Sequence, residues 1–249
     1  MKRINDFILF LGILIVLTGL GYFAYQGFYN RYWSDDWCYN NDFSSLGVLK
    51  TTGLYFATGE EASRGWPLNR YAMTLFSGIA YLPGVAGTQF LAAITLGIWW
   101  ASLNWVLSNL VKIKSLGIPK SLIFLSSGII LYYTLYISTD RFQILYWRSG
   151  VIPYSFSIIF GLIMLGILTN QMLGKNASIN IYLVAVAGFI GGGLSEIGCT
   201  FLLSGITLLL IVAWWQKLLG KKWARKSYLT IQIAWLTVLI SLVGSYAKS

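Results

Sequence analysis

Long apolar runs alternate with short polar stretches along the whole chain. Each run holds about 20 residues, enough for one helix to cross a hydrocarbon layer of roughly 30 Å. A backbone in lipid must satisfy its own hydrogen bonds, and the runs lack the alternation typical of barrel strands. We therefore predict an all-α, polytopic transmembrane bundle with about seven spans, at residues 7–25, 85–111, 122–137, 151–171, 179–194, 199–215 and 228–246.

The longest polar stretch, about residues 26–82, follows the first span and is expected to be an outer loop with surface helices. Apolar residues recur every three to five positions from Phe43 to Ala57, as in a helix lying on a membrane, and Asp42 is a candidate N-cap. Residues 67–82 predict a second surface helix or a shallow re-entrant one. Because no linker or repeat separates a soluble part, residues 1–249 are expected to form a single membrane domain.

Composition and charge exclude a soluble protein. Hydrophobic residues make up 57% of the chain and charged residues only 10%, whereas soluble domains carry about 25% charged residues. The net charge of +10 falls mostly in short loops, so we interpret it as the positive-inside pattern and expect no nucleic acid partner. Lys2 and Arg3 then place the N-terminus in the cytoplasm, and every acidic residue except Asp6 at the outer face.

The chemistry available is limited because the chain has no histidine. Catalytic triads and His-ligated metal sites are excluded, so proton transfer must use carboxylates, Lys or Tyr. The sharpest local signal is the adjacent pair Asp35 and Asp36, flanked by Trp33 and Trp37. Neighbouring side chains diverge, so one acid could be a base while the other binds a metal, an Arg or a backbone N–H. The alternative is a solvated loop anchored by interfacial Trp and Tyr.

An adjacent acidic pair in the first outer loop resembles the GT-C superfamily, membrane glycosyltransferases that use polyprenyl-phosphate-linked sugars. Residues 64–70 (Arg-Gly-Trp-Pro-Leu-Asn-Arg) look like a polar, aromatic stretch that a bacterial branch carries before the second span. Residues 146–154 (Tyr-Trp-Arg-Ser-Gly-Val-Ile-Pro-Tyr) look like that branch's aromatic-Trp-x-x-Gly-x-x-x-Tyr element. Seven spans are similar to the superfamily's membrane module. Many members continue beyond it, so we expect a minimal form or one that a membrane-protein partner completes.

The resemblance implies inverting sugar transfer at the outer side of a bacterial inner membrane. Asp35 or Asp36 would take the proton of an acceptor hydroxyl, on a glycan, lipid or protein, as that oxygen attacks the anomeric carbon. Polyprenyl phosphate would then leave. The residues leave open whether Mg²⁺, Mn²⁺ or no cofactor is used.

Binding of such a donor calls for positive charge and aromatic faces. Arginine forks match phosphate oxygens, and aromatic rings can stack on a sugar or a prenyl chain. The substrate-binding candidates are Arg64, Arg70, Arg141, Tyr146, Trp147, Arg148 and Tyr154. Among the arginines Arg148 is the first choice, and anchoring to lipid headgroups is the alternative for each.

Glu196 is an ionisable residue in an apolar run, directly after three glycines at 191–193. Such a residue usually faces an internal cavity and marks a functional path, which makes it a further substrate-binding candidate, or it pairs with an Arg. The glycines would let another helix or the lipid donor approach the backbone closely.

Two other classes of protein fit the sequence. A transporter of lipids or sugars would use Glu196 and the glycine-interrupted helices as its binding element. A non-catalytic subunit of a larger membrane complex fits the short chain. Replacement of Asp35 and Asp36 discriminates them, because only an enzyme loses turnover while it keeps its assembly.

Overall fold

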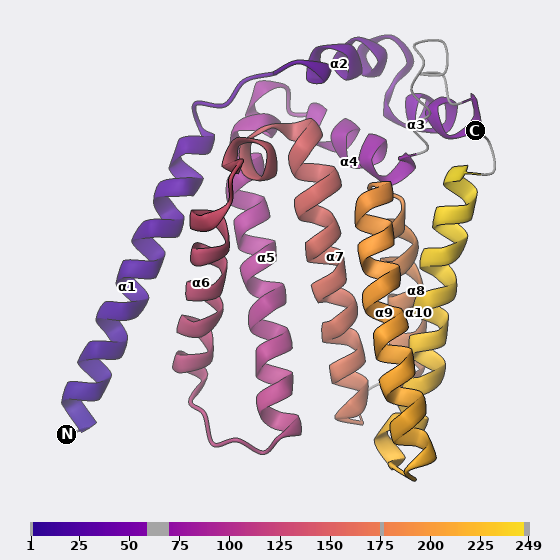
Figure 1. The fold of residues 1–249 in the computed structure, drawn as a ribbon. Coiled ribbons are helices and arrows are strands. Elements are labelled where there is room, and N and C mark those ends of the chain that lie inside the picture. Colours follow the sequence, from indigo (N-terminus) through magenta and orange to yellow (C-terminus); the bar gives the residue numbers. More distant parts are fainter. Residues whose placement is uncertain (1, 59–69, 175–176, 247–249) are drawn as a thin grey trace.

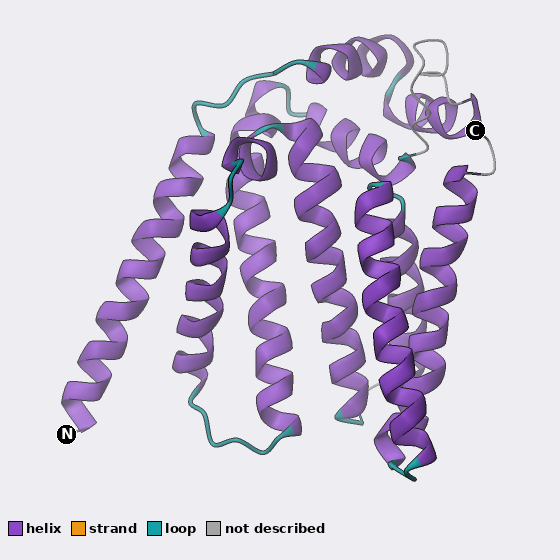
Figure 2. Cartoon of the chain, in the orientation of Figure 1, coloured by secondary structure: helices purple, strands orange, loops and turns teal. Residues whose placement is uncertain are grey.

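A bundle of helices covered by a helical cap makes up the molecule (Figures 1 and 2). The computed structural model describes residues 2–58, 70–174 and 177–246. The bundle consists of α1 (Lys2–Gly27), α5 (Val85–Ile113), α6 (Lys120–Ile137), α7 (Arg148–Met172), α8 (Ala177–Gly192), α9 (Glu196–Leu218) and α10 (Lys222–Tyr246). Six of these are long and apolar enough to cross a membrane. The predicted all-α polytopic bundle is therefore confirmed.

Helix α8 is the short member of the bundle. Its 16 residues span roughly 24 Å at 1.5 Å per residue, less than the usual hydrocarbon thickness. It packs against α7, α9 and α10. The prediction extended this span to residue 194, but the helix ends earlier, because the chain turns at Gly193 and Leu194.

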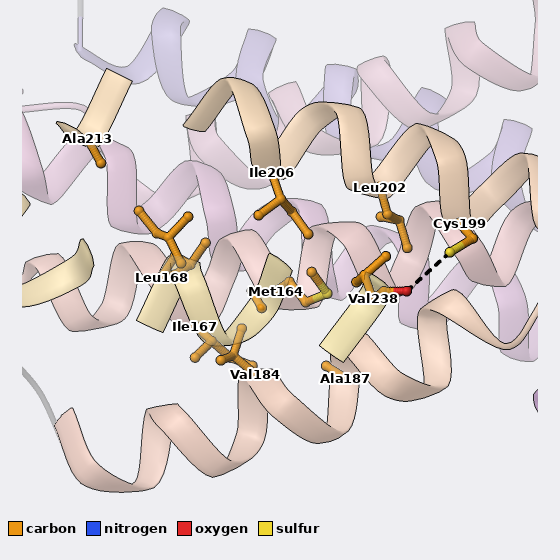
Figure 3. Packing of buried hydrophobic residues seen from close by; sticks show 12 residues of the cluster. Met164, Ile167, Leu168, Val184, Ala187, Cys199, Leu202, Ile206, Ala213 and Val238 are labelled. Atoms are coloured by element: carbon orange, nitrogen blue, oxygen red, sulfur yellow. Dashed lines mark hydrogen bonds between the residues drawn. The ribbon is translucent and has the colours of Figure 1, made fainter. Parts of the chain in front are cut away.

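Helix α7 crosses the centre of the molecule and joins its packed regions. Met164, Ile167 and Leu168 lie in a buried cluster with α8, α9 and α10, part of which Figure 3 shows. Ile159, nearer the start of α7, belongs to a second cluster with α1, α5 and α6. Because α7 is held on both sides, its first residues form a fixed platform at one end of the bundle.

The cap lies over that end of the bundle (Figure 1) and consists of α2 (Asp35–Leu46), α3 (Val48–Thr58), α4 (Tyr71–Tyr81) and the short π-helix η2 (Phe142–Tyr146). A third buried cluster attaches the cap to the bundle. Its members are Tyr39, Phe43, Tyr55, Ala72, Met73, Ile152 and Leu194. Helices in the polar stretch after the first span were predicted and are present.

The single surface helix predicted from Phe43 to Ala57 is wrong in its bounds. The chain forms two helices there, because Gly47 adopts φ 79°, a left-handed conformation that ends α2. Asp42 is not an N-cap. It lies inside α2, where its carboxylate accepts a hydrogen bond from the Tyr55 hydroxyl at 2.5 Å. The second predicted helix is α4, and residues 67–69 lie outside the described residues.

Acidic residues gather at one end of the bundle, as the sequence predicts. At the cap end lie the acidic residues Asp35, Asp36, Asp42, Asp140 and Glu196. At the opposite end, in or beside the loops, lie Lys112, Lys114, Lys120, Lys217 and Lys221. Glu60 and Glu61 fall outside the described residues. The carboxylates available for chemistry therefore gather at the cap end.

Candidate active site at the cap end

Asp35 and Asp36 form the first turn of α2. Ser34 precedes them at φ 46°, in the left-handed region, and this sharp turn lets the helix begin at Asp35. Successive side chains on a helix point about 100° apart, so the two carboxylates face different surroundings. Asp36 is fully buried and Asp35 is exposed.

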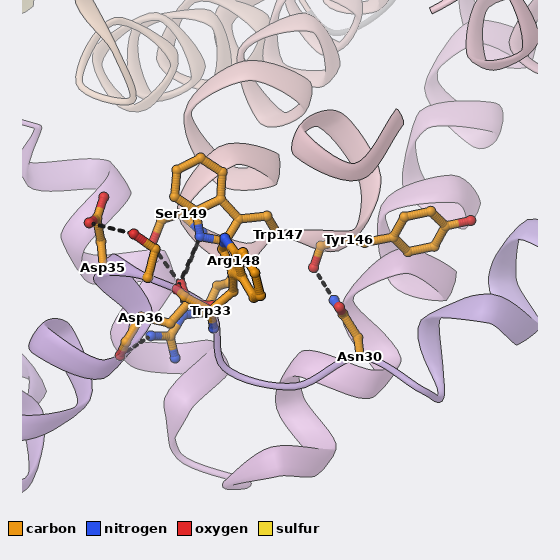
Figure 4. A network of polar contacts seen from close by, with 9 residues as sticks. Asn30, Trp33, Asp35, Asp36, Tyr146, Trp147, Arg148 and Ser149 are labelled. Carbon is orange, nitrogen blue, oxygen red and sulfur yellow. Dashed lines mark hydrogen bonds and ion pairs between the residues drawn. The ribbon is translucent and has the colours of Figure 1, made fainter. Parts of the chain in front are cut away.

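Both oxygens of the Asp36 carboxylate are bound by donors (Figure 4). Its Oδ1 accepts from the Ser149 hydroxyl at 2.6 Å and from the Ser149 amide at 3.3 Å. Its Oδ2 accepts from the Trp33 amide at 3.1 Å. The Nε atom of Arg148 lies 3.4 Å from Oδ1 and completes an ion pair. Asp36 is thus held in place by α7 and by its own loop.

Arg148, the first residue of α7, is fully buried. Its Nη2 donates to the Asp36 carbonyl oxygen at 3.0 Å, and its guanidinium carbon lies 5.5 Å from the centre of the Tyr32 ring. Within the described residues its Nε and Nη1 have no hydrogen-bond partner. The sequence proposed Arg148 as a direct phosphate ligand, but in this structure its side chain neutralises Asp36 and does not reach the surface.

Asp35 has the opposite surroundings. The one hydrogen bond to its carboxylate among the described residues comes from the Ser34 hydroxyl, at 3.2 Å. Trp33 and Trp37 on either side are 60% and 62% exposed. The Asp35 carboxylate therefore keeps free lone pairs toward solvent, with aromatic faces beside it.

A row of hydrogen bonds joins the loop after α1 to the segment before α7. The Asn30 side-chain amide donates to the Tyr146 carbonyl, and the Trp147 indole N–H donates to the Trp33 carbonyl at 3.3 Å. The Tyr146 hydroxyl lies 2.8 Å from the Gln26 side-chain oxygen. Three of the predicted residues, Tyr146, Trp147 and Arg148, thus lie in one strip beside the acidic pair.

In these contacts the Tyr146 hydroxyl acts as a hydrogen-bond donor. Burial raises the pKa of its phenol to about 12, and the charge of Arg141 opposes that rise. The phenol is therefore protonated at neutral pH and is excluded as a general base. Arg141 is exposed, with its guanidinium carbon 5.9 Å from the centre of the Phe23 ring.

Arg70 and Glu196 form a second charged pair, between the start of α4 and the start of α9. Arg70 Nε and Nη2 lie 2.9 and 2.7 Å from Glu196 Oε2, and the two side chains are 24% and 25% exposed. Glu196 follows Ser195, whose hydroxyl caps α9 by accepting from the Gly198 amide at 2.9 Å. The predicted alternative that Glu196 pairs with an Arg is therefore observed.

The glycine triplet allows α4 to approach, as the sequence suggested for another helix. The Tyr71 ring lies where a side chain on Gly193 would stand. The Ala72 amide donates to the Gly193 carbonyl at 3.1 Å, and the Tyr71 hydroxyl donates to the Phe189 carbonyl at 2.5 Å. The start of α4 is therefore fixed to the turn between α8 and α9.

Two of the predicted residues lie elsewhere. Tyr154 lines a cavity of about 370 Å³ among α5, α6, η2 and α7, together with Trp99 and Thr134. No acidic side chain lines that cavity among the described residues. Arg64 lies outside the described residues.

Three residues that contribute to these contacts were not singled out from the sequence. Ser149 and Asn30 are small polar residues whose partners are more than 110 positions away, so the sequence gives no sign of these contacts. For Tyr71 the signal was indirect, because the glycines indicated a close approach without naming the side chain.

Comparison of the chain with models of protein families, with curated proteins and with solved structures finds no match. Within the described residues, no group of three or more acidic or Cys side chains gathers as a metal site would require. The fold and the site together define a polytopic helical membrane protein. At one end it carries an exposed aspartate next to a buried aspartate–arginine pair.

Proposed function

We propose that the chain is an inverting glycosyltransferase of the GT-C type, which moves a sugar from a polyprenyl-phosphate carrier to an acceptor at the non-cytoplasmic face. The observation that carries this proposal is the asymmetry of the acidic pair. Asp36 is buried and bound on both oxygens, whereas Asp35 is exposed and holds one weak hydrogen bond. In such a pair the exposed carboxylate can take part in proton transfer, and the buried carboxylate holds it in position.

In the proposed reaction Asp35 is the general base. Its carboxylate accepts the proton of the acceptor hydroxyl while that oxygen attacks the anomeric carbon of the donor sugar. The bond from that carbon to the phosphate oxygen breaks, and polyprenyl phosphate leaves with the electron pair. Attack from the face opposite the leaving group inverts the anomeric centre, so no covalent enzyme intermediate forms.

Asp36, Ser149 and Arg148 are positioning residues in this proposal. They fix the first turn of α2 to the start of α7, and so they hold Asp35 at a constant place above the bundle. Catalytic groups need such support, because small displacements of a base lower the rate strongly. The leaving phosphate would meet the guanidinium of Arg141, which is exposed at the same end.

The proposal places the protein in a bacterial inner membrane, with the N-terminus in the cytoplasm and the cap outside. The lysine-rich loops opposite the cap support this orientation, since cytoplasmic loops carry an excess of Lys and Arg. The acceptor is a glycan, a lipid or a protein. Exposed carboxylates bind Mg²⁺ or Mn²⁺ through oxygen, so assays should contain both ions.

The test is sugar transfer in membranes that express wild type, Asp35→Asn or Asp36→Asn, with a panel of radiolabelled polyprenyl-phosphate sugars. We expect Asp35→Asn to unfold at the wild-type temperature but to lose transfer by about a hundredfold or more, as for removal of a general base. Asp36→Asn should lose both transfer and stability. Asp6→Asn, a change at an exposed acid at the opposite end of the bundle, is the matched control and should transfer normally.

Other outcomes point to the other classes of protein. If wild type transfers no sugar and both variants complement function in cells, the chain is a non-catalytic subunit. If Asp35→Asn is neutral while Glu196→Gln abolishes movement of a lipid or sugar across the membrane, the chain is a transporter.

A further inference from the structure

A shallow, open groove of about 470 Å³ lies along one face of α9 and begins at Glu196. Its lining residues are Glu196, Ile197, Thr200, Phe201 and Ser204. Glu196, Thr200 and Ser204 are spaced four apart and form one line along the helix, with Ile197 and Phe201 in a second line. The groove therefore combines a charged end with an apolar side.

The charged end keeps unused hydrogen-bonding capacity. Both contacts of Arg70 go to Glu196 Oε2. Within the described residues, Glu196 Oε1 and Arg70 Nη1 take part in no further hydrogen bond or ion pair. Each side chain is about a quarter exposed. Glu196 lines the groove and Arg70 is joined to it by their ion pair, so within the described residues a charged acceptor and a charged donor stand beside one end of the groove.

We propose that this groove binds a phospholipid whose zwitterionic head carries a primary ammonium group, as phosphatidylethanolamine does. The ammonium donates to Glu196 Oε1, the phosphate accepts from Arg70 Nη1, and one acyl chain lies along Ile197 and Phe201. This site does not depend on the proposed glycosyltransferase activity, since it shares no residue with the Asp35 site.

Charge and hydrogen bonding select this head over the other common ones. An anionic glycerol head has the same phosphate but no cation, so it leaves Glu196 Oε1 without a charged partner. A choline head offers a cation without an N–H donor, so it cannot make the charge-assisted hydrogen bond to the carboxylate. The groove starts at Glu196, the first residue of α9, and so at the cap end of the bundle (Figure 1).

Beyond Glu196, the lining of the groove is suited to an acyl chain. The Thr200 hydroxyl already donates to the Glu196 carbonyl at 2.8 Å, so its methyl group is left to the groove. Phe201 is 68% exposed and Ile197 is 67% exposed. Apolar side chains of this kind face lipid on a membrane-spanning helix, and here they begin next to a charged pair.

The experiment is native mass spectrometry of the purified full chain, titrated with dioleoyl phosphatidylethanolamine, phosphatidylcholine or phosphatidylglycerol. We expect wild type to retain phosphatidylethanolamine at about tenfold lower lipid concentration than the other two, the size of effect of one charge-assisted hydrogen bond. Glu196→Gln should remove that preference, while Asp140→Asn, its control, should keep it. Equal retention of the three lipids, or stronger retention of phosphatidylglycerol, would overturn the proposal.

Two further variants test the proposal independently, in case Glu196→Gln misfolds. Ser204→Trp fills the groove and leaves the Arg70–Glu196 pair intact, so it should lower retention of phosphatidylethanolamine by about tenfold as well. Ile240→Trp places the same side chain on α10, at a position that is 52% exposed, and should change nothing. If Ser204→Trp and Ile240→Trp behave alike, the lipid does not lie in this groove.

Discussion

Ser149 gives the buried Asp36 carboxylate two hydrogen bonds, one from its hydroxyl and one from its amide. Ser149→Ala removes the first and keeps the second. We expect the free energy of unfolding to fall by roughly 1.5–3 kcal/mol, because the bond reaches a buried charged acceptor. Detergent-induced unfolding measures this change.

The hydrogen bond between Ser149 and Asp36 should also make the stability effects of substitutions at these two residues non-additive. Ser149→Ala and Asp36→Asn share one interaction, so their combined effect should be smaller than the sum of the two. Ser44→Ala, on the exposed side of α2, is the control and should be additive with Asp36→Asn. Full additivity of Ser149→Ala would mean that the hydroxyl does not support Asp36.

The difference between Asp35 and Asp36 is partly readable from the sequence. Asp36, Tyr39, Asn40 and Phe43, the buried residues of α2, follow the three-and-four spacing of one helix face. That pattern was missed because the helix was predicted to begin at Asp42 and not at Asp35. The pairing with Arg148 has no local signal, since the two residues are 112 positions apart.

At the level of elements, the contact of α4 with the turn before α9 depends on Gly193. A methyl group there would collide with the Tyr71 ring. Gly193→Ala should therefore displace α4 and lower the free energy of unfolding by roughly 1–3 kcal/mol, the usual effect of overpacking. The thermal unfolding of the purified variant, compared with wild type, measures this.

Two further variants make that test specific. Tyr71→Ala removes the ring, so the double variant should lose less stability than the two single losses added together. Gly205→Ala, on α9 with open space around it, should be neutral or slightly stabilising, because alanine favours helix more than glycine does. An equal loss from Gly205→Ala would indicate a general effect of glycine replacement.

The elements of the bundle follow from the sequence far better than those of the cap. Each apolar run became one helix, because a backbone in lipid has no other partner for its hydrogen bonds. In the cap water competes for those bonds, and a single residue such as Gly47 decides where α2 ends. The glycines at 191–193 indicated a close neighbour, yet only the folded chain shows that the neighbour is α4.

For the whole molecule, orientation can be tested with the native cysteines. Cys38 is exposed on the cap and Cys199 is buried in α9. If the cap faces outward, a membrane-impermeant maleimide should label Cys38 in spheroplasts, and Cys38→Ser should abolish the labelling. Mass-tagged maleimide and gel analysis measure the modified fraction.

The end of the bundle opposite the cap needs a separate cysteine for labelling. Gly117 lies exposed in the loop between α5 and α6, so Gly117→Cys combined with Cys38→Ser should react only after the membrane is permeabilised. The reverse pattern would place the acidic pair in the cytoplasm and contradict the proposed orientation.

The row of contacts between the loop after α1 and the start of α7 has a consequence for biosynthesis. A ribosome adds about 5–20 residues per second, so Asp36 is made roughly 6 to 22 seconds before Arg148, given the 112 residues between them. During that interval the carboxylate lacks its partner and must remain hydrated. The first turn of α2 is therefore expected to stay unfixed until α7 enters the membrane, and any chain released before residue 148 would carry the acidic pair without the contacts that hold it.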